Sequence, residues 1–245
     1  MLDTIADNLR IVMVETSHPG NIGAAARAMK VMGQRHLYLV KPAIFPSAEV
    51  TARAAGADDL LEHAVVCNSL EEAVHDCVLV VGTTARVRRV PWTVEGPREG
   101  VTRIVETART GCVAVVFGRE DNGLNNEELG LCNTVVQIPT HPGFTSLNVA
   151  AAVQIVCYEI LQTAGAGTVA REDGASLATA EHMRQLYEHF AACMAEVGFY
   201  NPRKPRLLMR RLQRLFNRAQ LDLNEINILR GFLTAVQEFV RKERK

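Results

Sequence analysis

Short apolar runs of strand length alternate with segments of helical spacing through the first 110 residues. Four runs of aliphatic and β-branched residues, at positions 11–14, 37–40, 65–67 and 78–81, are each followed by a helical pattern, at 22–32, 48–55, 70–74 and 101–108. This alternation predicts successive strand and helix pairs that build a parallel sheet with helices on both faces.

Two further strands and a long helix complete this part of the chain. The runs at 113–117 and 135–138 have the length and composition of buried strands. The apolar stretch 147–161 is too long for a strand and contains neither Gly nor Pro, so we expect a buried helix. Together these elements predict an α/β domain over residues 1–165.

The chain changes character after this domain. Residues 163–176 contain three glycines and lack the periodicity of their neighbours, which predicts a linker over residues 166–178. Three helical patterns follow, at about 179–197, 205–219 and 224–241. We therefore expect a small helical extension over residues 179–245.

Composition narrows the class of protein. The chain has 245 residues, 48% hydrophobic and 22% charged, and can bury a full core. Its six cysteines include no C-x-x-C pair and its seven histidines form no ligand pattern, so we expect no metal site and a reducing compartment. The first residues do not have the basic, apolar and small-residue order of a signal peptide, and no apolar stretch is long enough to span a membrane. We therefore expect a cytoplasmic protein without a membrane partner.

The net charge of the chain is zero, but its basic and acidic residues are distributed unevenly between the α/β part and the helical extension. Residues 1–166 carry 13 basic and 18 acidic residues, whereas residues 167–245 carry 14 basic and 9 acidic ones. In the second helical pattern of the tail, arginines recur at every fourth position, and Leu208, Leu212, Leu215 and Phe216 occupy the opposite arc. The basic residues of this region are Arg203, Lys204, Arg206, Arg210, Arg211, Arg214 and Arg218.

No acidic residue interrupts the sequence between Pro202 and Leu221. Like charges at this spacing repel each other by roughly 0.2–0.5 kcal/mol per pair, and a polyanion would relieve that repulsion. A solvated helix face is the simpler explanation of any charge run. Here the absence of intervening acids favours a nucleic-acid interface.

The turn after the first expected strand has the composition of a phosphate-binding turn. H-P-G-N-I-G at residues 18–23 leads into a helix that carries Arg27, and backbone N–H groups at such a helix start can hold a phosphate. The pattern is not G-x-G-x-x-G, and the second strand ends in Lys41 rather than in an acid that would bind a ribose. A dinucleotide site is therefore the weaker interpretation.

Polar residues follow other expected strands, at the edge where open α/β sheets bind ligands. Thr83 and Thr84 follow the run 78–81, Glu120 follows 113–117, and Ser146 and Asn148 precede the long helix. Ser, Thr and Asn are also frequent turn formers and helix caps. Any functional interpretation therefore depends on their combination.

Three motifs supply that combination. N-x-G-A-x-x-R from Asn21 to Arg27, G-R-E-D-N-G-L at 118–124, and I-P at 138–139 with S-L-N-V-A at 146–150 resemble the motifs of the SpoU branch of the SPOUT superfamily of RNA ribose 2′-O-methyltransferases. The resemblance covers about residues 8–162. The motif domain comes first and a helical extension follows, which is similar to the bacterial tRNA enzymes that methylate the ribose of anticodon-loop nucleotide 32.

The resemblance implies a fold, a cofactor and partners. We expect a deep trefoil knot, S-adenosyl-methionine as methyl donor without a metal, tRNA as substrate, and an obligate homodimer whose subunits complete each other's active sites. The positions that match the family's cofactor site are Thr83, Thr84, Ala85, Gly118, Ile138, Thr145, Ser146 and Leu147.

The same resemblance implies five catalytic residues. Because a guanidinium stays protonated in proteins, our hypothesis is that Arg27 grips a phosphate and stabilises charge on the 2′ oxygen rather than acting as a base. Asn21 and Asn148 would orient the ribose or Arg27, Glu120 would fix Arg27 or the loop, and Ser146 would contact the target nucleotide.

Other interpretations stay open. The enzyme could act on rRNA or on another tRNA position. A non-catalytic RNA-binding module would explain the arginines without the motif residues, and an NADP-dependent oxidoreductase would explain the glycine turn and Lys41 without the basic tail.

Overall fold

The computed structural model describes residues 2–85, 94–165, 177–201 and 207–243. The chain divides into two compact units, Met1–Glu172 and Asp173–Lys245. Of the basic residues singled out in the tail, Arg203, Lys204 and Arg206 lie outside the described residues. None of the described helices is long and apolar enough to cross a membrane.

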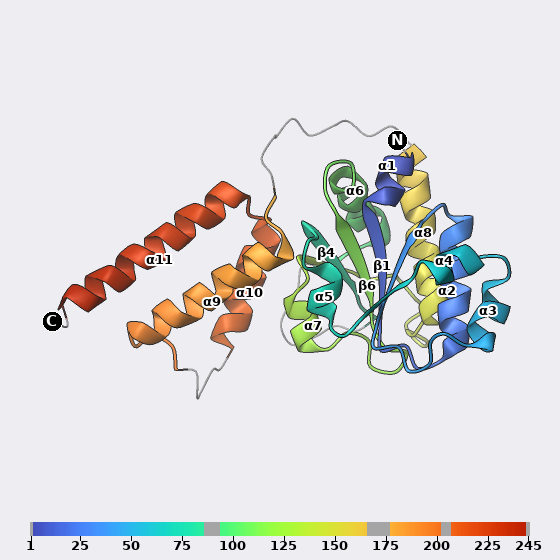
Figure 1. Ribbon diagram of the computed structural model, residues 1–245, viewed down its shortest axis with the longest axis horizontal. Coiled ribbons are helices and arrows are strands. Elements are labelled where there is room, and N and C mark those ends of the chain that lie inside the picture. Colours follow the sequence, from blue (N-terminus) through green and yellow to red (C-terminus); the bar gives the residue numbers. More distant parts are fainter. Residues whose placement is uncertain (1, 86–93, 166–176, 202–206, 244–245) are drawn as a thin grey trace. The chain divides into compact units, whose positions relative to one another are not determined.

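A seven-stranded sheet forms the centre of the first unit, with every neighbouring pair parallel (Figure 1). Six strands confirm the expected runs, although the last of them ends at Val136, so that Ile138 lies in the following loop. A strand of two residues at the sheet edge was not expected, because two residues carry no alternation. The strands are β1 Leu9–Val14, β2 His36–Val40, β3 Val65–Cys67, β4 Leu79–Thr83, β5 Val94–Glu95, β6 Val113–Phe117 and β7 Thr134–Val136.

The strand order is β3-β2-β1-β6-β4-β7-β5. The chain builds outward from β1 to β3 on one side and then returns to build the other side, so β1 and β6 are neighbours, paired from Leu9 with Val113 to Met13 with Phe117. This is the point at which the order reverses. In open α/β sheets, ligands bind outside the carboxyl ends of the strands at such a switch point.

Helices cover both faces of the sheet, as the sequence predicts. On one face Ile11, Val81 and Val115 belong to a buried cluster with residues of α2, α6 and α8. On the other face α5 contacts β2 and β3, and Leu129 of α7 lies against Gly82 of β4. Figure 1 shows α2, α3 and α8 on one side of β1 and α5 on the other. The helices are α1 Leu2–Asp7, α2 Pro19–Val31, α3 Ala48–Ala54, α4 Asp58–Glu62, α5 Leu70–Val74, α6 Pro97–Thr107, α7 Asn126–Gly130 and α8 Val149–Gly165.

The helix after β1 begins earlier than the sequence suggested. It starts at Pro19, a residue suited to the first helical position, so Asn21 and Gly23 lie inside the helix and not in a glycine-rich turn. A Cβ added at Gly23 would lie 2.2 Å from the carbonyl oxygen of Val50 in α3. The expected helix start at residue 22 was therefore too late, and Gly23 permits the close packing of α2 against α3.

The second unit contains α9 Ala180–Glu196, α10 Leu208–Ala219 and α11 Leu223–Glu243. These helices agree with the three expected patterns to within about three residues at each end. Their shared core centres on Leu186, Cys193, Ile226 and Leu233. A small helical unit therefore follows the α/β unit along the chain.

The apolar arc expected on α10 is rotated by about one residue position, or ~100°. Leu215 is 44% exposed, which contradicts the prediction that it packs in the core. The buried residue of the helix is instead Asn217, whose side-chain oxygen accepts a hydrogen bond from the hydroxyl of Tyr187. A polar residue with a partner on α9 thus takes the central packing position, while Arg210, Arg211 and Arg218 remain exposed.

Candidate functional site

A cavity of about 170 Å³ opens at the carboxyl edge of the sheet, beside the switch point. The loops after β4, β6 and β7 and the residues before α8 form its walls. All eight positions expected to hold a cofactor line it, although they are spread over 65 positions of the sequence. They are Thr83, Thr84, Ala85, Gly118, Ile138, Thr145, Ser146 and Leu147.

The loop after β6 folds back on itself, and two glycines make this possible. The Gly123 N–H donates to the carbonyl oxygen of Arg119 at 2.9 Å. A Cβ added at Gly118 would lie 2.2 Å from the backbone nitrogen of Leu124, and Gly123 has a φ of 65°, a conformation that glycine adopts without strain. The motif therefore needs both glycines to form one wall of the cavity.

Arg119 clamps this loop between two carboxylates. Its guanidinium contacts both oxygens of Glu15, each at 2.8 Å, and both oxygens of Glu128, at 3.0 and 2.9 Å. The hydrogen bonds from Arg119 lower the pKa of Glu15 despite its partial burial, and the two carboxylates raise the pKa of Arg119. With its donors committed in this way, Arg119 positions the loop and leaves substrate contacts to other groups.

The sequence interpretation missed this clamp. Glu15 lies 104 residues before Arg119, and no spacing rule connects them. One local signal was available, because Asn125 and Glu128 form a capping box at the start of α7, which fixes the Glu128 carboxylate near the loop.

Glu120 holds the segment between β1 and α2. One carboxylate oxygen accepts from the backbone N–H and the hydroxyl of Ser17, at 3.1 and 3.0 Å, and the other accepts from the His18 N–H at 3.3 Å and the Asn21 amide at 2.9 Å. Partial burial opposes ionisation of Glu120, but the hydrogen bonds from Asn21 and the two N–H groups outweigh it and lower its pKa. Glu120 is therefore an ionised anchor for the segment between β1 and the first turn of α2, and its hydrogen bonds are with Ser17, His18 and Asn21 and not with Arg27.

Asn21 extends this network to the start of α8. The Asn148 amide nitrogen donates to the Asn21 side-chain oxygen at 2.8 Å. The side-chain oxygen of Asn148 accepts from the N–H groups of Ala150 and Ala151, at 2.9 and 3.3 Å. Asn148 thus caps α8 and at the same time contacts Asn21, and its expected role at the ribose stays a prediction.

Ser146 and Arg27 stand outside the network. Ser146 is exposed and lines the cavity. Arg27 is exposed on α2, does not line the cavity, and has no hydrogen bond or ion pair with the described part of the chain. The structure therefore joins three of the five expected catalytic residues by contact, and leaves the charge of Arg27 without a counter-ion among them.

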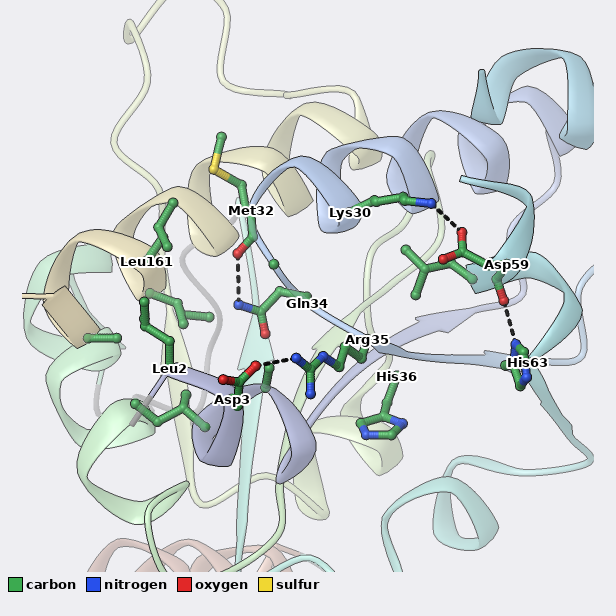
Figure 2. A pocket seen from close by; sticks show the side chains of 16 residues that line it. Leu2, Asp3, Lys30, Met32, Gln34, Arg35, His36, Asp59, His63 and Leu161 are labelled. Atoms are coloured by element: carbon green, nitrogen blue, oxygen red, sulfur yellow. Dashed lines mark hydrogen bonds and ion pairs between the residues drawn. The ribbon is translucent and has the colours of Figure 1, made fainter. Parts of the chain in front are cut away.

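A second, larger cavity of about 710 Å³ lies at the amino edge of the sheet, where the chain enters β2 (Figure 2). None of the expected site residues lines it. Two ion pairs lie among its polar residues, Asp3 with Arg35 and Lys30 with Asp59, and Figure 2 shows both. Size alone therefore does not identify the functional site. The smaller cavity is the better candidate because the expected cofactor positions line it.

A parallel α/β unit with an opening beside its switch point, bordered by the loops after β4, β6 and β7, has the arrangement in which open α/β domains bind ligands. Residues 8–158 match the SpoU rRNA Methylase family, and residues 181–245 match the domain described as tRNA methyltransferase TrmJ, C-terminal domain. The chain belongs to the SpoU methylase family, which confirms the resemblance stated from the motifs and the expected fold class.

Individual relatives are similar in sequence over nearly the whole chain. This protein is 46% identical to the tRNA (cytidine/uridine/adenosine-2′-O-)-methyltransferase TrmJ of Pseudomonas aeruginosa (strain UCBPP-PA14), over 96% of each chain. It is 33% identical to the crystal structure of TrmJ from Z. mobilis ZM4, with a TM-score of 0.82 over 93% of this chain and 98% of that one. The family assignment favours the methylase interpretation over the oxidoreductase.

A more distant structure shares the fold of the first unit. The SpoU methyltransferase AviRb from Streptomyces viridochromogenes, solved in complex with the cofactor AdoMet, is 24% identical with a TM-score of 0.53. The match covers 66% of this chain and 62% of that one. At this identity the likeness concerns the fold alone.

Proposed function

We propose that this protein transfers a methyl group from S-adenosyl-methionine to a ribose 2′-hydroxyl of tRNA, at anticodon-loop nucleotide 32. The observation that carries the proposal is the gathering of all eight expected cofactor positions around one cavity beside the switch point. The name of the TrmJ relative from Pseudomonas aeruginosa supports tRNA and the 2′-hydroxyl as substrate. Nucleotide 32 rests on the resemblance to the bacterial anticodon-loop enzymes.

The cavity residues suit this cofactor. Small and hydroxyl side chains at Thr83, Thr84 and Gly118 leave backbone groups accessible, and Ile138 and Leu147 offer apolar contacts. Its volume of about 170 Å³ is smaller than the roughly 300–1,000 Å³ of most small-molecule sites. A site completed by a second subunit would explain the difference, and we propose a homodimer with shared active sites.

The chemistry assigned to the side chains follows from what methyl transfer needs. A bound S-adenosyl-methionine supplies a methyl group already activated on sulfur. The protein must align the 2′-oxygen with that group and stabilise negative charge as the oxygen loses its proton. Arg27, with no counter-ion among the described residues, is suited to grip a neighbouring phosphate and stabilise that charge.

The other motif residues position the reacting groups. Glu120 fixes the segment that leads into α2, the helix that carries Arg27. Asn21 and Asn148 link this segment to α8, and we propose that Ser146 contacts the target nucleotide. No step of this scheme uses a metal.

We propose that the second unit holds the tRNA. Arg210, Arg211 and Arg218 are exposed on one side of α10, where they can contact phosphates. We assign residues 1–165 to catalysis, 166–178 to a linker and 179–245 to tRNA binding. The trefoil knot remains a prediction from the family resemblance, and a cytoplasmic location remains a prediction from the sequence pattern.

The test is direct methyl transfer. The purified full-length protein is incubated with unmodified tRNA transcript and S-adenosyl-methionine labelled in the methyl group, and the product is mapped by nuclease digestion and mass spectrometry. We expect one 2′-O-methyl group at nucleotide 32. Label at another tRNA position or in rRNA would refute the assigned position, and absence of any labelled RNA, with NADPH bound in preference to S-adenosyl-methionine, would refute the activity.

A further inference from the structure

Two cysteines meet at the amino edge of the sheet, opposite the candidate cofactor cavity. Cys77 lies just before β4 and Cys112 just before β6, and the Val78 N–H donates to the Cys112 carbonyl oxygen at 2.9 Å. Their Sγ atoms are 3.3 Å apart. A disulfide has an S–S distance of about 2.05 Å, so the two sulfurs are roughly 1 Å from bonding distance.

This pair differs from the other cysteines of the chain. Cys67, Cys132, Cys157 and Cys193 are buried, and burial raises the pKa of each thiol, to about 12 for Cys132 and Cys157. Cys112 alone is partly exposed. Only the thiolate is a strong nucleophile, so the four buried thiols are chemically inert by comparison.

The surroundings of Cys112 favour its thiolate. A hydrogen bond from the Cys77 thiol lowers the pKa of Cys112, burial opposes this, and the nearby charge of Arg10 adds to the lowering. Asp76 acts in the opposite direction, and His75 lowers the pKa slightly. Cys77 responds in the opposite way, because sharing its proton with Cys112 and being buried both raise its pKa.

We propose that Cys77 and Cys112 form an oxidisable dithiol that a hydroperoxide converts into a reversible disulfide. The Cys112 thiolate attacks one peroxide oxygen, so that an S–O bond forms, the O–O bond breaks and hydroxide leaves. The Cys77 sulfur then attacks the Cys112 sulfenic acid, forming the S–S bond, and the displaced hydroxide takes up the Cys77 thiol proton as water. Both sulfurs are oxidised by one electron each. With hydrogen peroxide the products are one water and the hydroxide released in the first step, which takes up a proton from the solvent to become the second water.

A metal is the competing use of this cluster. Asp76, Cys77 and Cys112 offer three ligand atoms within 4.8 Å of one another. However, both carboxylate oxygens of Asp76 accept hydrogen bonds from Arg10, at 2.6 and 2.5 Å, and Arg10 also donates to the Ala73 carbonyl and lies over the ring of Tyr38. A metal would have to displace this bidentate pair, whereas a disulfide leaves it intact.

The position of the proposed Cys77–Cys112 disulfide determines how it would affect stability and cofactor binding. It would join the entries of two neighbouring central strands, between residues 35 positions apart in sequence. Such a cross-link restricts the unfolded chain and stabilises the folded one. Because the cavity residues lie at the other ends of these strands, we expect oxidation to raise the midpoint of thermal unfolding and leave cofactor binding unchanged.

The test treats the full-length protein with a small excess of hydrogen peroxide and maps the cysteines by alkylation and mass spectrometry. We expect a mass loss of about 2 Da, a cross-linked peptide pair containing Cys77 and Cys112, and a rise in Tm of a few degrees that dithiothreitol reverses. Before oxidation, Cys112 should react with iodoacetamide at pH 7 at least about tenfold faster than any other cysteine.

Two alanine variants separate the roles of the sulfurs. In Cys77→Ala, a sulfenic acid should persist on Cys112 and be trapped by dimedone, whereas Cys112→Ala should remove peroxide sensitivity altogether. Cys157→Ala, which changes a buried cysteine elsewhere, should keep the normal disulfide. Free thiols at both positions after peroxide, cross-linking of other cysteines, or a stoichiometric bound metal lost in both Cys77→Ala and Cys112→Ala would overturn the proposal.

Discussion

Replacing Glu120 by glutamine removes one negative charge from the loop network and keeps the shape of the side chain. Four donors, from Ser17, His18 and Asn21, converge on the carboxylate. A glutamine has one acceptor oxygen and turns an NH₂ group toward the remaining donors, so one side of this arrangement becomes repulsive. The segment between β1 and α2 should therefore lose its fixed position.

The contacts give the size of the effect. A hydrogen bond to a charged group contributes about 1.5–3 kcal/mol, and the solvent exposure of this loop brings the loss toward the lower end of that range. Each 1.4 kcal/mol corresponds to about tenfold in rate when the lost arrangement is required for reaction. We expect kcat/KM for tRNA methylation by Glu120→Gln to fall by roughly tenfold.

The assay compares initial rates of labelled methyl transfer for the natural chain, Glu120→Gln and Glu127→Gln. Glu127 is an exposed acid in the first turn of α7, so its variant removes the same charge seven residues away and should keep full activity. Equal rates for all three proteins would refute the anchoring role of Glu120. A loss of the same size in Glu127→Gln would show that net charge, not the network, matters.

The pH dependence of stability supplies an independent test. Because the pKa of Glu120 is lowered in the folded protein, its ionised form stabilises the fold above the ordinary value of 4.5, and this contribution is lost as the pH falls through the lowered pKa. The natural chain should therefore resist urea better than Glu120→Gln at pH 7, and the difference should vanish in strong acid. A difference that persists unchanged at low pH would contradict the assigned cause.

Three further changes test other contacts. Arg119→Lys removes the paired contacts with two carboxylates and should lower the free energy of unfolding by about 2 kcal/mol in urea titrations; an unchanged midpoint would argue against the clamp. Gly118→Ala places a Cβ against the backbone of the same loop and should abolish S-adenosyl-methionine binding in calorimetry, so retained affinity would contradict the cavity assignment. Exchanging Arg210, Arg211 and Arg218 for glutamine should weaken tRNA binding and flatten its salt dependence by about one unit of slope per lost phosphate contact, whereas an unchanged slope would place the tRNA elsewhere.

The sequence predicted the parts of the fold that depend on local periodicity. Alternating apolar runs located six strands and most of the long helices, because burial on both faces of a parallel sheet leaves a continuous apolar signal. The elements α1, α4, α7 and β5 were missed. Each has six residues or fewer, a length at which periodicity is a weak guide, although α5 of five residues was located. The rotation of α10 was missed for a different reason: Asn217 takes the core position through its bond with Tyr187, and a polar residue gives no apolar signal.

The candidate site, too, was predicted only in part from the sequence. Motif positions identified the residues around the cavity, since each follows a strand and the strands end at one edge. The contacts among them could not be predicted, because Arg119 meets Glu15, and Asn148 meets Asn21, across more than 100 residues of sequence. Such pairings depend on strand order, which local patterns do not specify.

The side chain of Asn21 makes hydrogen bonds to two partners that need opposite roles from it. Its side-chain nitrogen donates a hydrogen bond to Glu120, and its side-chain oxygen accepts one from Asn148. Aspartate there would set two carboxylates against each other, and a hydroxyl is too short to span both neighbours. Only a carboxamide satisfies the two demands together, so this position should vary in evolution solely in step with 120 and 148.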